Sequence, residues 1–147
     1  GFGTGFDAVP LIERGCEVQG VDLSEGMVSV ARSRGVDAQV ADLHDLDLSR
    51  SFDKILCAGP LEFCVSPGRV LRRLSDHLRP GGSLVVLFPP PTLSGRLYAL
   101  YHRSNGLPIQ LYDVPSFTAW MRAADLCPDA LLRPGPFSVV VRARAAP

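Results

Sequence analysis

Three short segments place ligand-binding residue types where the pattern predicts strands to meet helices. The chain opens with Gly1-Phe2-Gly3-Thr4-Gly5, whose glycines allow positive φ and a close approach of backbone to a ligand. Asp22 follows Gly5 by 17 residues, and a carboxylate there can accept hydrogen bonds from both hydroxyls of a ribose. Asp42 can accept from an adenine amino group, while the backbone N–H of Leu43 can serve a ring nitrogen. The spacing therefore predicts an adenosine-binding edge.

Each of these segments also has a plain structural interpretation. A glycine-rich stretch is often only a turn, Asp22 could cap a helix, and Asp42 could be an ordinary loop residue. The three occur in order at the ends of expected strands, and carboxyl ends of parallel strands meet at one edge of a sheet. Folding alone does not require glycines and two acids there, so their joint occurrence favours a binding site.

Strand and helix patterns alternate along the chain and predict one α/β domain over residues 1–147, with a doubly wound, Rossmann-like, mostly parallel sheet. Caps and glycine stops set the bounds, with Asp7, Ser24 and Ser66 as expected N-caps. The expected strands are 17–22, 36–40, 52–57 and 83–88, followed by a terminal hairpin of 130–133 and 137–144; the expected helices are 7–14, 25–34, 67–78, 93–103 and one starting at Ser116.

The amino-acid composition narrows the range of functions that the protein could have. Fifteen basic and fifteen acidic residues cancel, so the net charge favours neither nucleic acid nor an anionic membrane surface over a small molecule. No apolar run has membrane-spanning length, so we expect no membrane insertion, and four widely spaced cysteines without a C-x-x-C pair favour a cytoplasmic protein. The spacing of cysteines and histidines predicts reduced thiols and no metal site: Cys16, Cys57, Cys64, Cys127, His44, His77 and His102.

The segments together resemble the class I S-adenosylmethionine-dependent methyltransferases over about residues 1 to 88. Residues 1–5 resemble their glycine loop, 20–27 (GVDLSEGM) their ribose segment, and Asp42-Leu43 their adenine contact. Residues 52–57 (FDKILC) are similar to their fourth strand, and 78–82 (LRPGG) to the turn before their fifth.

This resemblance implies S-adenosyl-L-methionine as the cofactor and the strand order 3-2-1-4-5-7-6, with the last strand antiparallel. The residues that it assigns to the cofactor are Gly1, Gly3, Thr4, Gly5, Asp22, Leu23, Met27, Asp42, Leu43 and Cys57. The first strand of that order, with an acid just before the first glycine, would precede Gly1. We therefore expect an N-terminally truncated domain that is poorly stable and essentially inactive alone.

Two positions depart from the family pattern. Where many relatives read Leu-Glu-His after the fourth strand, this chain reads Leu61-Glu62-Phe63. In Ala124-Asp125, an aspartate stands where relatives often have the glycine that favours a left-handed helix cap, which we expect to cost stability rather than function.

Residues after the fourth and fifth strands are expected to face the reacting methyl group: Ala58, Gly59, Pro60, Glu62 and Phe88. A sulfonium methyl is already activated, so positioning could supply most of the catalysis. Glu62 alone among them can take a proton. It is the one candidate catalytic residue, although a solvated loop carboxylate is the interpretation that its residue type favours.

Residues 89–114 are expected to be an insertion that covers the acceptor. Leu93, Leu97, Leu100 and Tyr101 share one helical face, with Tyr98 beside them, which suggests a small apolar or aromatic acceptor. The alternative is that this stripe packs on the sheet. His102 in the same segment is a possible substrate contact, although a solvated helix histidine is the simpler interpretation.

Two other functional classes stay open at this point. A nicotinamide-dependent oxidoreductase would need a glycine at position 6 of its G-x-G-x-x-G turn, where this chain has Phe6. A non-catalytic methyltransferase-like binding module could keep the fold and lose the cofactor acids, but both Asp22 and Asp42 are present. The sequence therefore favours the enzyme, and it does not indicate the oligomeric state.

Overall fold

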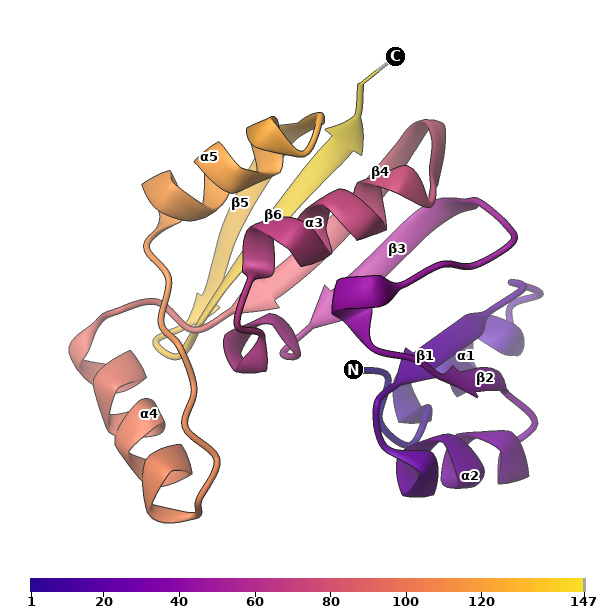
Figure 1. The fold of residues 1–147 in the computed structure, drawn as a ribbon, viewed down its shortest axis with the longest axis horizontal. Helices are drawn as coiled ribbons and strands as arrows, with labels where there is room; N and C mark the ends of the chain where they lie inside the picture. The colour runs from indigo at the N-terminus through magenta and orange to yellow at the C-terminus, as the bar shows by residue number, and fades with distance from the viewer. Residues whose placement is uncertain (147) are drawn as a thin grey trace. The chain divides into compact units, whose positions relative to one another are not determined.

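The computed structural model describes residues 1–146, and the chain folds into two compact units (Figure 1). Residues Gly1–Leu46 form the first unit, and the chain from Asp47 onward forms the second. The expected single domain over residues 1–147 stays a prediction.

The first unit is a two-stranded parallel sheet with a helix between its strands. Strand β1 (Gln19–Asp22) pairs with β2 (Asp37–Val40) in a register that places Asp22 opposite Val40. Helix α2 (Glu25–Ser33) connects them, and its predicted N-cap is confirmed because Ser24 Oγ accepts from the Met27 amide at 3.4 Å. The core of this unit is small and lies between helix and sheet: Ala8, Val28, Ala31, Val36 and Ala38, with Phe2 and Val18 packed against it.

The prediction of a helix over residues 7–14 is wrong about the length of that helix. The chain instead forms a 3-10 turn at Phe6–Ala8 and a four-residue helix α1 (Val9–Ile12). The turn starts from Gly5 at φ 71°, the Ala8 amide donates to the Gly5 carbonyl at 3.1 Å, and the Asp7 side chain caps nothing. Because the left-handed glycine closes a tight i→i+3 turn, little of the segment remains for regular helix.

The second unit contains a four-stranded sheet in the order β3-β4-β6-β5. Strands β3 (Phe52–Ala58) and β4 (Leu78–Phe88) are parallel, whereas β6 (Ser138–Ala145) is antiparallel to both β4 and β5 (Leu126–Gly135). The terminal hairpin is confirmed, although β5 is longer than predicted. Strand β4 also begins five residues earlier than expected, at Leu78 rather than Ser83.

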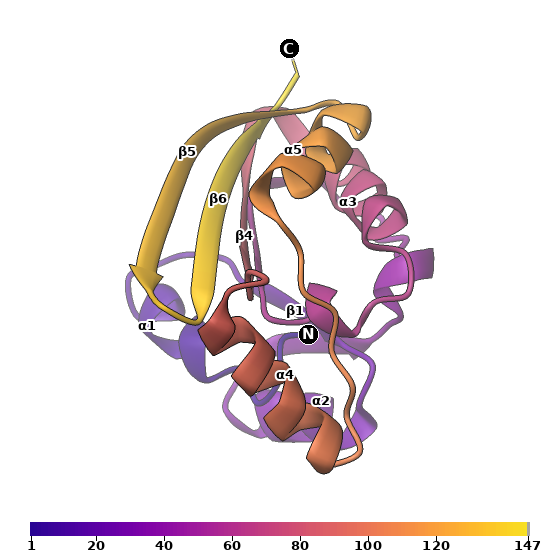
Figure 2. The ribbon, with the colours of Figure 1, turned by 90° about the vertical axis from the view of Figure 1, so that its left-hand side faces the viewer.

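Helices α3 (Pro67–Asp76) and α5 (Val114–Ala123) pack together over one face of this sheet (Figure 2). Helix α5 begins two residues before Ser116, because Asp113 is the cap and its carboxylate accepts from the Ser116 amide at 2.8 Å. The side chains buried beneath the helices form the core: Leu61, Val70, Leu71, Leu84, Val86, Phe88, Phe117, Met121, Leu126, Val139 and Val141. Asp125 after α5 has φ 57°, which confirms a non-glycine residue in the left-handed cap.

The strand order within each sheet agrees with the family order expected from the sequence. The pair β1-β2 corresponds to family strands 2 and 3, and β3-β4-β6-β5 corresponds to 4-5-7-6 with strand 7 antiparallel. Within residues 1–146, β1 pairs only with β2, and β3 pairs only with β4.

Candidate cofactor and acceptor site

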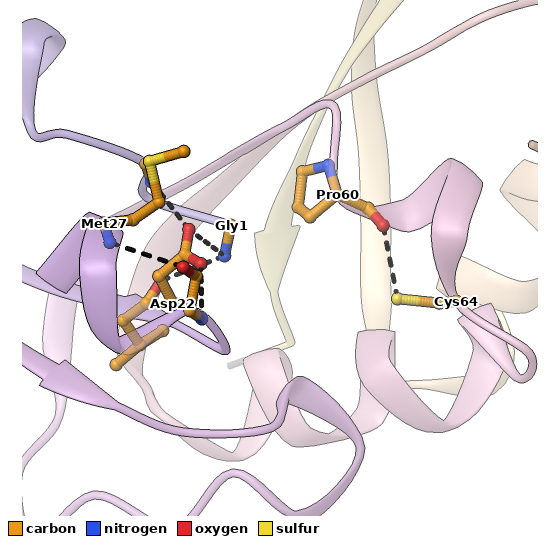
Figure 3. Close-up of polar contacts among 8 residues, drawn as sticks. Gly1, Asp22, Met27, Pro60 and Cys64 are labelled. Atoms are coloured by element: carbon orange, nitrogen blue, oxygen red, sulfur yellow. Dashed lines mark hydrogen bonds and ion pairs between the residues drawn. The ribbon is translucent and has the colours of Figure 1, made fainter. Parts of the chain in front are cut away.

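Asp22 ties the end of β1 to the glycine loop of the first unit (Figure 3). Its Oδ2 accepts from the Gly3 amide at 2.7 Å, and its Oδ1 accepts from the Ser24 amide at 2.9 Å. The terminal ammonium group of Gly1 and the amide of Phe2 both donate to the Val21 carbonyl at 2.9 Å, which lays the loop alongside the strand. The carboxylate is therefore fixed in direction.

The environment of Asp22 also keeps its carboxyl group negatively charged. Partial burial raises the pKa of this carboxyl, but the backbone N–H groups of Ser24 and Gly3, the charge of the terminal ammonium group and the Leu23 N–H together outweigh it and hold the pKa below the ordinary value. The group is ionised at neutral pH. Each oxygen has a second lone pair beyond its backbone bond, so an ionised and oriented acceptor remains for a diol.

Gly3 and Gly5 of the loop lie in different surroundings. Gly5 has φ 71°, and a Cβ on it would lie 2.9 Å from the Phe2 ring and 3.2 Å from the Ala31 Cβ. Gly3 has φ 61° and nothing within 4 Å of such a Cβ. Packing against the core therefore requires glycine at position 5. At Gly3 the loop is instead open, which leaves space where a ligand could approach.

The other assigned residues of the ribose segment lie around this loop. Thr4 is held by Arg34, whose Nη1 donates to the carbonyl oxygen and to Oγ1 of Thr4, each at 2.8 Å. Leu23 and Met27 expose large apolar side chains directly after the strand end. These two side chains are available to cover a bound base.

Asp42 follows β2 and belongs to a local turn that the sequence did not reveal. Its Oδ1 accepts from the His44 amide at 2.8 Å and lies 2.8 Å from Nδ1 of the same residue. Leu43 has a buried side chain, so only its backbone can serve a ligand. The contacts of His44 show that it orients the Asp42 carboxylate.

Cys57, next to last in β3, and Phe88, the last residue of β4, have buried side chains. Burial raises the pKa of the Cys57 thiol to about 12, so the thiol is neutral. Phe88 stacks on Phe117 with ring centroids 4.0 Å apart, and its ring belongs to the core. The expectation that Phe88 faces the reacting methyl group is therefore wrong, because the inward side of β4 is covered by α5.

Glu62 lies in a 3-10 turn (Leu61–Phe63) after β3 and is buried. Only 4% of the residue is exposed, and among the described residues its Oε2 has no hydrogen-bond partner. Burial raises the pKa of this carboxyl to about 7. The interpretation of Glu62 as a solvated loop carboxylate is therefore wrong. A buried carboxyl with one unpaired oxygen and a pKa near neutrality is typical of a group that exchanges a proton with a ligand.

A segment almost fifty residues later fixes the turn that carries Glu62. The Gln110 amide donates to the Glu62 carbonyl at 2.7 Å, and Gln110 Nε2 donates to the Cys64 carbonyl at 3.2 Å. The Tyr112 hydroxyl donates to the Leu61 carbonyl at 3.0 Å. Figure 3 shows a further bond inside the turn, from Cys64 Sγ to the Pro60 carbonyl at 3.4 Å. Backbone bonds between distant segments leave no local pattern, which is why the sequence did not predict Gln110 or Tyr112.

Helix α4 (Leu93–Ser104) contributes aromatic groups beside this turn. The His102 ring lies 4.4 Å from Tyr98, 5.7 Å from Tyr101 and 5.9 Å from Phe63, measured between ring centroids. Burial, followed by the charge of Glu62, raises the pKa of Tyr98. His102 is therefore a half-buried member of an aromatic cluster and not a solvated helix histidine.

Comparison with known proteins identifies the family. The methyltransferase domain family matches residues 1–86, more than half of the chain. The chain belongs to this methyltransferase family. S-adenosylmethionine is the cofactor that membership assigns to it.

Individual methyltransferases are similar over part of the chain. Demethylmenaquinone methyltransferase of Clavibacter sepedonicus is 35% identical over 111 residues, which cover 69% of this chain and 45% of that protein. Ubiquinone biosynthesis O-methyltransferase of Xanthomonas oryzae pv. oryzae is 33% identical over 94 residues, covering 58% and 39% respectively. The chain thus spans less than half the length of these relatives.

A solved methyltransferase structure shares the fold. Magnesium protoporphyrin IX methyltransferase from Synechocystis, solved with bound S-adenosylhomocysteine, superposes with a TM-score of 0.80 at 19% identity. The match covers 99% of this chain and 72% of that one. It supports the methyltransferase fold that the family match indicates.

The first unit fits this cofactor in its own geometry. An ionised, oriented carboxylate at the strand end suits a ribose diol, and the open side of Gly3 leaves room beside it. The Leu43 side chain is buried, so only the Leu43 backbone could meet a ligand, whereas Thr4 Oγ1 accepts from Arg34 and keeps its own proton to donate. Among residues 1–146, no helix is long and apolar enough to cross a membrane.

Proposed function

We propose that this protein transfers the methyl group of S-adenosylmethionine to a protic heteroatom of a small apolar or aromatic acceptor, with Glu62 as the proton acceptor. The observation that supports it best is the buried Glu62 carboxyl, whose Oε2 has no partner among the described residues. The family match supports the methyl transfer, and the quinone-pathway names of the relatives suit an aromatic acceptor.

The roles of the residues follow from their environments. When bound, the cofactor supplies a methyl group that is already activated by the sulfonium charge. In the first unit, Asp22 would hold the ribose and Asp42 the adenine. Gly1, Gly3 and Gly5 would keep the backbone close, and Leu23 and Met27 would cover the base. Glu62 takes a proton from the acceptor hydroxyl or amine, and its surroundings exclude water.

We assign the binding of the methyl acceptor to residues 92–114, which follow β4. Leu93, Leu97, Leu100 and Tyr101 are exposed, so the alternative that this stripe packs on the sheet is wrong. The inward side of α4 instead presents Tyr98 and His102 near the Glu62 turn. Exchanging residues 92–114 for those of a relative should change acceptor preference and leave the affinity for S-adenosylhomocysteine intact. An unchanged acceptor profile would count against this role of the segment.

A methyl-transfer assay tests the proposal. The protein is incubated with methyl-labelled S-adenosylmethionine and with acceptors paired on one carbon skeleton, phenols with their methyl ethers and anilines with their N,N-dimethyl derivatives. We expect label only in acceptors with a protic heteroatom, and a rate that rises as pH increases through about 7 because Glu62 must be ionised to accept the proton. Glu62→Gln should abolish this pH dependence and lower the rate roughly a hundredfold or more. A Glu62→Gln protein with the wild-type rate and profile would remove Glu62 from the mechanism.

A further inference from the structure

Helix α4 exposes a continuous apolar face. Leu93, Leu97, Leu100 and Tyr101 recur at the spacing of one helical face, and their exposed fractions are 77%, 59%, 63% and 65%. Leu107, 55% exposed, follows just after the helix. On the opposite side, Gly95 is buried and Tyr98 and His102 are half-buried. The helix therefore turns its polar and small residues inward and its large apolar residues outward, which is unusual for a face that meets only water.

Positive charge accompanies this face without any negative charge. Arg96 and Arg103 are both exposed and lie seven residues apart, along the flank of the apolar stripe. No aspartate or glutamate occurs between positions 77 and 112. The zero net charge of the whole chain therefore does not describe α4, which carries two exposed arginines and no carboxylate.

The apolar face and the flanking arginines together indicate one kind of binding partner for α4. A second copy of the chain would bring a cationic face against an identical one, which like-charge repulsion disfavours. A helix of 12 residues spans about 18 Å, too short for a bilayer core of about 30 Å, so it cannot cross a membrane. An amphipathic helix with leucines and a tyrosine on one side and flanking arginines suits the plane of an anionic lipid surface.

We propose that α4 docks this protein on the surface of an anionic phospholipid bilayer. Leu93, Leu97, Leu100 and Tyr101 enter the boundary between headgroups and acyl chains, and Arg96 and Arg103 pair with lipid phosphates. The inward side of the same helix lies beside the Glu62 turn, since His102 is 5.9 Å from Phe63. An acceptor dissolved in the bilayer would meet this turn next to the lipid surface. The lipid contact itself goes beyond the proposed methyl transfer and does not depend on it.

Flotation with lipid vesicles tests the docking without any activity readout. The protein is mixed with vesicles of phosphatidylcholine, or of phosphatidylcholine containing 30% phosphatidylglycerol, at low salt and at 0.5 M NaCl. We expect at least tenfold stronger binding to the anionic vesicles, with most of it lost at high salt. Equal binding to both vesicle types, or none to either, would overturn the proposal.

Three variants locate the contact. Leu97→Ser/Leu100→Ser and Arg96→Ala/Arg103→Ala should each weaken binding about tenfold or more, since each arginine near an anionic surface contributes roughly a fivefold factor. The matched control is Leu131→Ser/Leu132→Ser, which changes two exposed leucines on β5 and should bind like wild type. Unchanged binding by both α4 variants overturns the proposal. So does a dimer in sedimentation velocity that Leu97→Ser/Leu100→Ser dissociates, because the face would then meet a second copy.

Discussion

The Tyr112 hydroxyl donates a hydrogen bond to the Leu61 carbonyl oxygen at 3.0 Å, across 51 positions of the chain. This contact and the two from Gln110 hold the turn that carries Glu62. The Tyr112 ring is itself fixed by packing against Phe88 and Trp120. The turn therefore depends on a residue that lies far from it in sequence.

Tyr112→Phe removes this hydrogen bond and keeps the ring packing. The Leu61 carbonyl loses a partner in a buried place, so we expect a stability loss of about 1 kcal/mol in urea unfolding. Methyl transfer should fall roughly tenfold or more because Glu62 is no longer held in place, while S-adenosylhomocysteine affinity stays the same. Ser33→Ala, which removes an exposed hydroxyl of α2, is the control and should change neither quantity. An undiminished transfer rate in Tyr112→Phe would show that the bond does not position Glu62.

Glu62→Gln should stabilise the protein at alkaline pH. The folded-state pKa of Glu62 is raised to about 7 from an ordinary 4.5, so the folded protein holds a proton that the unfolded chain releases. Stability therefore falls as pH rises from about 4.5 to 7, by about 3 kcal/mol in total. Glutamine does not ionise, so the variant should melt higher than wild type at pH 8 and equally at pH 4.5. A variant less stable than wild type at pH 8 would contradict the buried state of this carboxyl and its unpaired Oε2.

The two left-handed glycines of the loop should respond differently to alanine. Gly3→Ala meets open space and should cost only the left-handed strain, about 1 kcal/mol. Gly5→Ala adds a clash with the Phe2 ring at 2.9 Å and should cost about 3 kcal/mol. Urea unfolding followed by circular dichroism measures both. Equal losses of stability would mean that the core beneath Gly5 shifts to accommodate the added methyl group.

The sequence predicted features that local patterns encode. Ser24 caps α2 as expected, Asp22 ends its strand beside the glycine loop, and Asp125 takes the left-handed cap. Each depends on residues close together in the chain. The burial of Glu62 escaped prediction because it depends on packing from residues 98–112, and the capping of α5 by Asp113 was missed because Ser116 offered a competing signal.

Calorimetric titration of S-adenosylhomocysteine tests the central claim most directly. Wild-type protein, with whatever residues flank this chain, should bind it and should not bind NADH, which separates the methyltransferase from a nicotinamide-dependent enzyme. Asp22→Asn removes the ionised acceptor and should cost about 2 to 3 kcal/mol, a roughly 30- to 150-fold loss of affinity. Asp37→Asn, an exposed aspartate at the start of β2, should bind like wild type. Wild-type affinity in Asp22→Asn, or NADH binding in place of S-adenosylhomocysteine, would contradict the account.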